Sequence, residues 1–271
     1  SGGIDLGLPA GATPNLSIIL GGAATRLEDL VGAYTAFANG GIAGTPRYTP
    51  QQSASPRRIL SPGAAWIIRE ILGSNPADVE GAPLAGVINR HANVAWKTGT
   101  SYGYRDAWAV GVTDRWTIGV WIGRPDGTPS PGQYGAVTAL PLLFQIADML
   151  PQRGGRTHAA QPASVRAIDI CWPLGGAATT TPAPLCRQRR SAWILDGAIP
   201  PTFAERDRGA WSSGSLTLRV NQHGQRLSGA CHAAHERTIQ LARWPLLATP
   251  WLSVDDRRAA ALPPLAPGCA A

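Results

Sequence analysis

The sequence predicts an α+β fold, in which helices cover an antiparallel sheet, followed by a small β-rich module. Two segments with apolar residues at helical spacing come first in the chain. Three runs rich in β-branched and aromatic residues follow at 94–101, 107–113 and 116–123. Only Asp114-Arg115 separates the last two runs, which is short enough for a hairpin turn. Helices beside hairpin-linked strands favour an antiparallel sheet with a helical layer.

Local end signals mark the expected helices. The first follows Thr25-Arg26-Leu27-Glu28, which has the form of a capping box with Thr25 as the N-cap. Asn39-Gly40-Gly41 is a stop signal for that helix. The second expected helix begins with Ser61 as N-cap and Pro62 at the first helical position, and it ends at Gly73. A third helix is expected over residues 138–150.

The chain changes character near residue 151. Residues 151–165 are rich in Gly, Arg, Gln and Ala and read as a linker between a first domain, 1–150, and a small module, 166–271. Within the module, residues 216–220 predict a strand, His223-Gly224 a turn, and the residues from Arg226 onward a return strand. We therefore expect a short-stranded module that is held together largely by cross-links.

All four cysteines of the chain lie in this module, namely Cys171, Cys186, Cys231 and Cys269. An even number in a loop-rich module favours two disulfides and an oxidising compartment. Three pairings are open, and the local pair Cys171–Cys186 would close a loop worth about 3 kcal/mol in the chain-entropy model. A metal site built on Cys231, His232 and His235 is the alternative, but no Cys-x-x-Cys pair accompanies it, and we expect no metal.

Composition restricts the classes of partner. The net charge of +7 comes from scattered arginines, with one dense run at Arg187-Gln188-Arg189-Arg190 and no recognition motif, so no nucleic-acid partner is expected. No apolar run reaches the roughly 18 residues of a membrane helix. Because the chain begins at Ser1 rather than Met, we expect it to be a piece of a longer protein, with membrane contact only through an upstream anchor.

Lys97 is the only lysine of the chain, and it opens the segment Lys97-Thr98-Gly99-Thr100 on a predicted strand. Alternation on a strand places Thr98 and Thr100 on one side, where two hydroxyls can donate to a carboxylate. Gly99 lets another element approach the backbone closely, and a nearby N–H could stabilise an oxyanion. Lysine supplies a compact ammonium whose geometry arginine does not reproduce. These residues are the candidate catalytic and substrate-binding groups.

This context resembles the transpeptidase domain of class A penicillin-binding proteins. The resemblance rests on 16–22, 27–41, 97–101, 105–111 and 118–124. It continues through the second part of the chain, most closely to the family's 1C type, at Ile170-Cys171-Trp172-Pro173, Leu195-Asp196-Gly197, Trp244-Pro245-Leu246 and Leu262-Pro263-Pro264. It thus covers nearly the whole chain, in the same order.

The resemblance implies a peptidoglycan synthase at the periplasmic face of the bacterial inner membrane, with an acyl-serine D,D-transpeptidase that cross-links stem peptides and is acylated by β-lactams. It also implies an upstream glycosyltransferase domain and no cofactor. By the same resemblance, Lys97 supplies positive charge, while Thr98 and Thr100 hold the substrate carboxylate. The Thr100 N–H completes the oxyanion hole.

The family's Ser-x-x-Lys and Ser-x-Asn motifs do not occur in this sequence, so the chain alone is expected to be inactive. A different class of function stays open beside the enzyme. The chain could be a non-catalytic cell-wall binding or docking module of a penicillin-binding-like protein.

Overall fold

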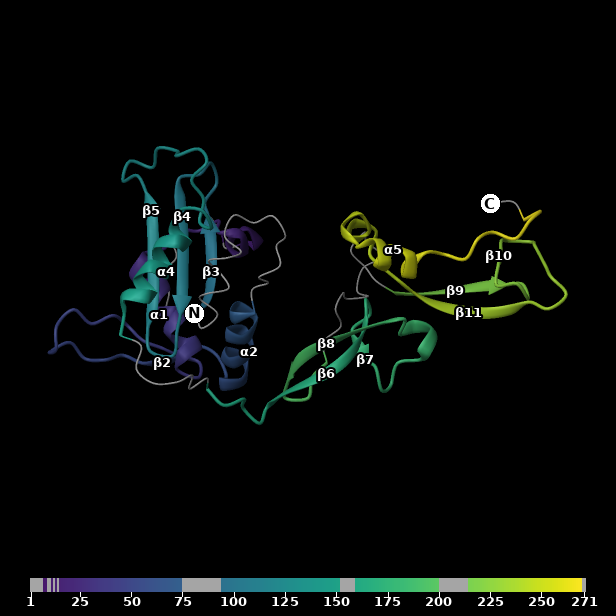
Figure 1. The fold of residues 1–271 in the computed structure, drawn as a ribbon, viewed down its shortest axis with the longest axis horizontal. Helices are drawn as coiled ribbons and strands as arrows, with labels where there is room; N and C mark the ends of the chain where they lie inside the picture. Colours follow the sequence, from purple (N-terminus) through teal and green to yellow (C-terminus); the bar gives the residue numbers. More distant parts are fainter. Residues whose placement is uncertain are drawn as a thin grey trace. The chain divides into compact units, whose positions relative to one another are not determined.

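The computed structural model describes residues 7–8, 11, 13, 15–74, 94–151, 159–199 and 214–269. The chain forms two compact units, Ser1–Ala163 and Ser164–Ala271 (Figure 1). The expected linker, 151–165, spans the junction between these units, and its residues 152–158 lie outside the described part. Within the described residues, no helix is long and apolar enough to cross a membrane.

A three-stranded antiparallel sheet forms the centre of the first unit. Its strands are β3 (Ala95–Thr100), β4 (Asp106–Val112) and β5 (Thr117–Gly123), in the order β3-β4-β5. At the predicted hairpin, the Thr113 N–H donates to the Trp116 carbonyl at 2.8 Å. The fold is therefore α+β with an antiparallel sheet, as the sequence predicts, and each strand lies within one residue of its expected bounds.

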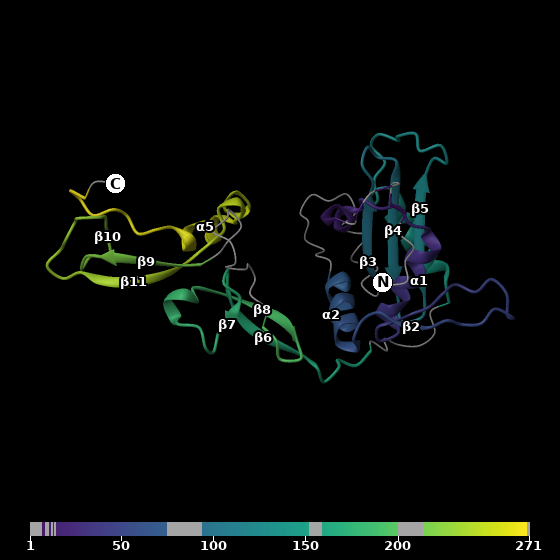
Figure 2. The ribbon, with the colours of Figure 1, turned by 180° about the vertical axis from the view of Figure 1, so that it is seen from behind.

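Two helices cover opposite faces of this sheet (Figures 1 and 2). A Cβ on Gly119 of β5 would collide with Val31 of α1 (Leu27–Ala38). A Cβ on Gly111 of β4 would lie 2.9 Å from Leu143 of α4 (Ala139–Met149). Because Gly111 pairs with Ile118, the neighbour of Gly119, alternation places these glycines on opposite faces. Each helix thus packs closely on a glycine.

The main hydrophobic core lies between the sheet and α4. Edge-to-face packing of Trp96 on Phe144, with ring centroids 6.1 Å apart, joins β3 to this core. The buried members of the cluster are Val94, Ala107, Ala109, Ile118, Val120, Ala139, Leu140, Leu143, Phe144 and Ala147. This core fixes the position of the strand that carries Lys97.

The helix ends follow the sequence closely, with one wrong cap. The third expected helix, 138–150, is α4, which begins and ends one residue inside these bounds. In α2 (Pro62–Gly73), the Ser61 hydroxyl accepts from the Ala64 N–H at 3.2 Å, as predicted. The expected capping box at Thr25 is wrong, because Arg26 is the N-cap of α1 and makes no side-chain cap bond. The buried Thr25 hydroxyl has no hydrogen-bond partner among the described residues. Glu28 instead accepts hydrogen bonds from Arg26 and from the Tyr48 hydroxyl.

The remaining elements of the first unit are short. A 3₁₀ helix, η1, spans Leu16–Leu20. The two-residue strands β1 (Ile42–Ala43) and β2 (Arg57–Arg58) pair antiparallel beside α1. The buried Arg69 of α2 forms an ion pair with Asp114 of the β4–β5 turn, which ties that helix to the hairpin.

The described residues of the second unit form two small antiparallel sheets. One has the order β7-β6-β8, with β6 (Val165–Trp172), β7 (Gly176–Ala177) and β8 (Gln188–Leu195). The other has the order β10-β9-β11, with β9 (Gly214–Val220), β10 (Arg226–Leu227) and β11 (Arg237–Arg243). The predicted strand and its return strand are β9 and β10. The helical segments are η2 (Ala183–Leu185), η3 (Leu246–Trp251) and α5 (Val254–Ala260).

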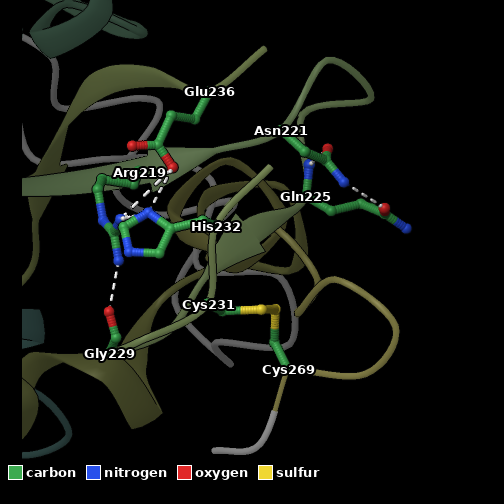
Figure 3. Close-up of a disulfide and its surroundings, with 8 residues drawn as sticks. All are labelled: Arg219, Asn221, Gln225, Gly229, Cys231, His232, Glu236 and Cys269. Atoms are coloured by element: carbon green, nitrogen blue, oxygen red, sulfur yellow. Dashed lines mark hydrogen bonds and ion pairs between the residues drawn. A yellow bond between two sulfur atoms is a disulfide. The ribbon is translucent and has the colours of Figure 1, made fainter. Parts of the chain in front are cut away.

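Two disulfides cross-link this unit, Cys171–Cys186 and Cys231–Cys269. The first joins the end of β6 to the segment before β8. The second, drawn in Figure 3, fastens the last described segment. This segment runs along β10 and is held by hydrogen bonds from the Arg226 N–H to the Pro264 carbonyl and from the Ala266 N–H to the Arg226 carbonyl. Of the three pairings that the sequence leaves open, the structure has the one that contains the local pair.

Candidate functional site

The segment Lys97–Thr100 occupies the second half of β3, which is an edge strand of the sheet. Within the described residues, no strand pairs with the outer edge of β3. Lys97, Gly99 and Thr100 are exposed, and Thr98 is half-buried. The expected site residues of the first domain therefore lie together on one accessible strand.

Hydrogen bonding at the end of β3 fixes the direction of its backbone groups. The Ser101 N–H donates across to the Asp106 carbonyl at 3.0 Å. In an antiparallel ladder, residues bonded across to the partner strand alternate with residues whose polar groups point away from it. The N–H groups of Thr98 and Thr100 therefore point away from β4, toward the open edge. In agreement, the Thr98 carbonyl accepts from the Lys97 ammonium at 2.7 Å rather than from the ladder.

The two threonine side chains share the face of the sheet that α4 covers. Gly135, in the loop before α4, approaches both of them. Its N–H donates to the Thr100 hydroxyl oxygen at 3.1 Å, and a Cβ on Gly135 would lie 3.0 Å from the Thr98 Cβ. Because the Thr100 oxygen is the acceptor in this bond, its own O–H proton is still available to a ligand.

Gly135 is a site residue that the sequence does not reveal. A Cβ at this position would lie 2.5 Å from the carbonyl oxygens of Gly99 and Trp108, so only glycine fits. At Gly99, an added Cβ would meet only the Trp108 Cβ at an ordinary 3.6 Å. The close backbone approach expected here therefore exists, but the missing side chain that permits it belongs to Gly135. Its neighbours come from strands distant in the chain, so no local sequence pattern could identify it.

Lys97 and Gly99 lie on the opposite face from the two threonines, next to two tryptophans. Trp108 is the cross-strand partner of Gly99, and its ring centroid lies 6.4 Å from that of Trp121. The Trp121 indole N–H donates to the Asp106 carboxylate at 2.8 Å. These rings border the Lys97 side of the strand.

Two of the three residues of the alternative metal site, Cys231 and His232, have other partners. Cys231 is bonded to Cys269, and the His232 ring lies 3.2 Å from the Arg219 guanidinium and 3.5 Å from the Glu236 carboxylate (Figure 3). Arg219 also donates to the Gly229 carbonyl. Among the described residues, no group of three or more His, Cys, Asp or Glu side chains could hold a metal ion. The zinc alternative therefore has no support from this geometry.

Comparison with known proteins places relatives along the whole chain. Residues 164–194 match the model of the penicillin-binding protein 1C linker domain, and residues 209–260 match that of the second linker domain of penicillin-binding protein 1C. Penicillin-binding protein 1C of Escherichia coli (strain K12) is 44% identical over 269 residues, which are 98% of this chain and 34% of that protein. The chain thus spans about a third of the length of this relative.

More distant relatives match shorter parts. Penicillin-binding protein 1A of Clostridium perfringens is 26% identical over 168 residues, 57% of this chain and 18% of that protein. The crystal structure of penicillin-binding protein 1A from Haemophilus influenzae aligns with a TM-score of 0.49 at 18% identity, covering 68% of this chain and 34% of that one. By its sequence, the chain is a close homologue of penicillin-binding protein 1C of Escherichia coli, and its second unit matches the models of both linker domains of penicillin-binding protein 1C.

Proposed function

We propose that this chain is the substrate-clamping part of an acyl-serine D,D-transpeptidase, within a longer peptidoglycan synthase. One observation carries the proposal. The outer edge of β3, with which no strand pairs in the described part of the chain, presents the outward N–H groups of Thr98 and Thr100 beside the exposed Lys97 ammonium. An extended peptide can bind such an edge through main-chain hydrogen bonds while neighbouring side chains read its end groups.

Each group has a distinct role in the proposed reaction. The hydroxyls of Thr98 and Thr100 donate to the terminal carboxylate of a stem peptide, and Gly135 holds the Thr100 oxygen in place. The Thr100 N–H donates to the oxyanion that forms when a serine attacks the peptide carbonyl, a kind of donor typically worth about 10² to 10³ in rate. Lys97 supplies positive charge beside the serine of the Ser-x-Asn motif, which the longer protein would carry. The intermediate then collapses, breaks the peptide bond and releases the C-terminal residue with a free amine, which leaves an ester on the serine. An amine of a second stem peptide attacks this ester, forms the new amide bond and frees the serine hydroxyl.

The serine must come from outside the 271-residue chain, because the chain has no Ser-x-x-Lys or Ser-x-Asn motif. We expect the isolated chain to be inactive for that reason. The longer protein would carry the nucleophile, a membrane anchor and a glycosyltransferase domain. Its proposed partners are stem peptides and β-lactams, and no cofactor takes part.

The second unit has a structural role in this proposal. We assign residues 1–150 to the transpeptidase domain, 151–165 to the connection, and 166–271 to a linker module. The two disulfides of the module fit an oxidising compartment, which supports a site at the periplasmic face of the inner membrane.

The test is labelling with a fluorescent penicillin. The longer protein encoded with this chain should form a covalent adduct at a serine upstream of Ser1, and the 271-residue chain should form none. Lack of labelling by the longer protein would contradict the transpeptidase function and favour a non-catalytic wall-binding module. Labelling of the isolated chain would show that our assignment of the nucleophile is wrong.

A further inference from the structure

A cavity of about 480 Å³ lies at the open end of the β4–β5 hairpin, opposite its turn. It is next to β3, but the residues that line it have no role in the function proposed above. Its polar lining comes from Arg105, Arg124, Ser130 and Gln133, and its apolar lining includes Ala107 and Ile122. A volume of this size is within the range of about 300 to 1,000 Å³ that is typical of small-ligand sites. The mixture of two guanidinium groups, a hydroxyl and an amide over an apolar floor fits an anionic group on a hydrocarbon stem.

The charge of the cavity is largely uncompensated. Within the described residues, neither the Arg105 nor the Arg124 guanidinium has a carboxylate within ion-pair distance or a hydrogen-bond partner, and both residues are exposed. Asp106, the neighbour of Arg105, accepts from the Trp121 indole instead. Asp126 accepts from the Thr128 N–H at 3.0 Å, and it has a favourable Coulomb interaction with Arg124. Two arginine forks are thus available for bidentate bonds to an anion.

The two loops that form the cavity wall are joined to each other. The Ser130 N–H donates to the Tyr104 carbonyl at 2.9 Å, and the Gln133 N–H donates to the Ser130 carbonyl at 3.0 Å. Tyr104 itself has a left-handed backbone with φ of 58°, a conformation that costs energy for a residue other than glycine. The surrounding hydrogen bonds hold it there, so the wall is formed before any ligand arrives.

The cavity opens on the same side of the sheet as the threonine hydroxyls. Ala107, part of its lining, is the cross-strand partner of Thr100. Partners in an antiparallel pair point to the same face, with Cβ atoms about 4.5 to 5.5 Å apart. A peptide whose end is held at Thr98 and Thr100 can therefore reach the cavity with a neighbouring side chain.

We propose that this cavity binds the side-chain carboxylate of an acidic peptide, through Arg105 and Arg124. The choice of a peptide as ligand rests on the proposed transpeptidase function, whereas the binding itself needs no nucleophile and no acyl transfer. Peptide binding is measured on the 271-residue chain, and acylation is measured on the longer protein. A failure of the binding proposal is therefore distinguishable from a failure of the transpeptidase proposal.

The experiment titrates the ¹⁵N-labelled chain with the blocked peptide acetyl-Ala-Glu-Ala-amide and with its neutral match, acetyl-Ala-Gln-Ala-amide. The glutamate peptide should shift the amide signals of Ser130 and Gln133 and bind about tenfold more tightly than the glutamine peptide, because a charge-assisted hydrogen bond is worth that much in affinity. Titration with inorganic phosphate tests whether the cavity binds any small anion rather than an acidic peptide. It should bind more weakly than the peptide, since it makes no apolar contact.

Two variants and a matched control complete the test. Arg105→Gln and Arg124→Gln should each weaken binding of the glutamate peptide about tenfold. Arg115→Gln removes the same charge at the turn between β4 and β5, away from the cavity, and should leave affinity unchanged. Equal binding of the two peptides would overturn the proposal. So would an equal loss in Arg115→Gln, which would indicate general charge attraction, or phosphate binding as tight as the glutamate peptide.

Discussion

At the scale of single residues, Lys97 combines an exposed side chain with a position on a strand edge that no other described strand covers. Its contact with the Thr98 carbonyl can be exchanged for a ligand, because that carbonyl is not part of the sheet ladder. A guanidinium in the same place keeps the charge but is planar and wide. We therefore expect lysine and arginine at position 97 to support folding equally well but to place the positive charge differently with respect to the reacting groups.

We predict that Lys97→Arg in the longer protein slows acylation by a β-lactam by at least about a hundredfold, the cost of losing one well-placed electrostatic group. The thermal midpoint should stay within about 1 °C, because an exposed substitution changes stability little. Acylation rates are measured by stopped-flow with a fluorescent penicillin. The control Arg115→Lys should change neither quantity. Near wild-type acylation of Lys97→Arg would show that the role assigned to Lys97 is wrong.

Gly135 is the second residue for which the structure predicts a specific effect of substitution. Gly135→Ala places a Cβ 2.5 Å from two carbonyl oxygens, so the loop must move away from β3. We expect a loss of about 1 to 3 kcal/mol in the free energy of unfolding, together with loss of the bond to Thr100. Gly99→Ala is the matched control and should cost less, because its Cβ meets only an ordinary contact. Urea unfolding of both variants is the measurement, and equal losses would contradict the packing argument.

At the scale of elements, Ser61 caps α2 with its hydroxyl, whereas Thr25 does not cap α1. Ser61→Ala removes the hydroxyl that accepts from Ala64 and should cost about 1 kcal/mol of stability. Thr25→Val should be neutral or stabilising, because the buried Thr25 hydroxyl has no partner among the described residues to lose. Thermal unfolding measures the loss of stability in each of the two variants, and we expect a loss in Ser61→Ala only. A larger loss in Thr25→Val would mean that the hydroxyl does cap α1.

The first turn of α1 also carries a pH-dependent contact. The hydrogen bond from the Tyr48 hydroxyl, followed by that from Arg26, lowers the pKa of Glu28 below its ordinary value of 4.5. A carboxyl with a lowered folded-state pKa contributes stability above the unfolded-state pKa, and this stability is lost as pH falls through the folded-state pKa. We predict that Tyr48→Phe raises the pKa of Glu28, as followed by NMR titration of its side chain. Tyr102→Phe, at a residue that is 94% exposed, should leave it unchanged.

At the scale of the whole molecule, the stability of the second unit depends on its cross-links. Each of its two sheets has three strands, and in each sheet one strand, β7 or β10, is only two residues long. We predict that the unreduced chain is lighter than the reduced chain by four hydrogens, two for each disulfide, as measured by intact mass spectrometry. Four free thiols with bound zinc would contradict both disulfides.

The two disulfides should differ in how much each adds to the free energy of unfolding of the second unit. In the chain-entropy model, Cys231–Cys269, with a separation of 38 residues, contributes about 4 kcal/mol, and Cys171–Cys186, with a separation of 15, about 3 kcal/mol. Double serine variants of each pair, unfolded in urea and followed by amide exchange in β9 and β6, test this order. A greater loss from the Cys171–Cys186 pair would show that strain or residual structure outweighs loop entropy.

The sequence by itself determined the α+β class, the β4–β5 hairpin, the stop of α1 at Asn39 and both ends of α2. These features follow from periodicity, end signals and short connections, which are properties of neighbouring residues. The sequence also identified Lys97–Thr100 as the segment of interest, by composition and by resemblance.

Only the tertiary structure determined which polar groups are satisfied and which are exposed. It placed the Thr25 hydroxyl without a partner among the described residues, brought Gly135 onto the threonine strand, turned the Thr98 and Thr100 N–H groups toward an open edge, and selected one of three cysteine pairings. Each of these outcomes depends on segments far apart in the chain. Their contacts are set by how the sheets and helices pack together, which no local pattern of residues records.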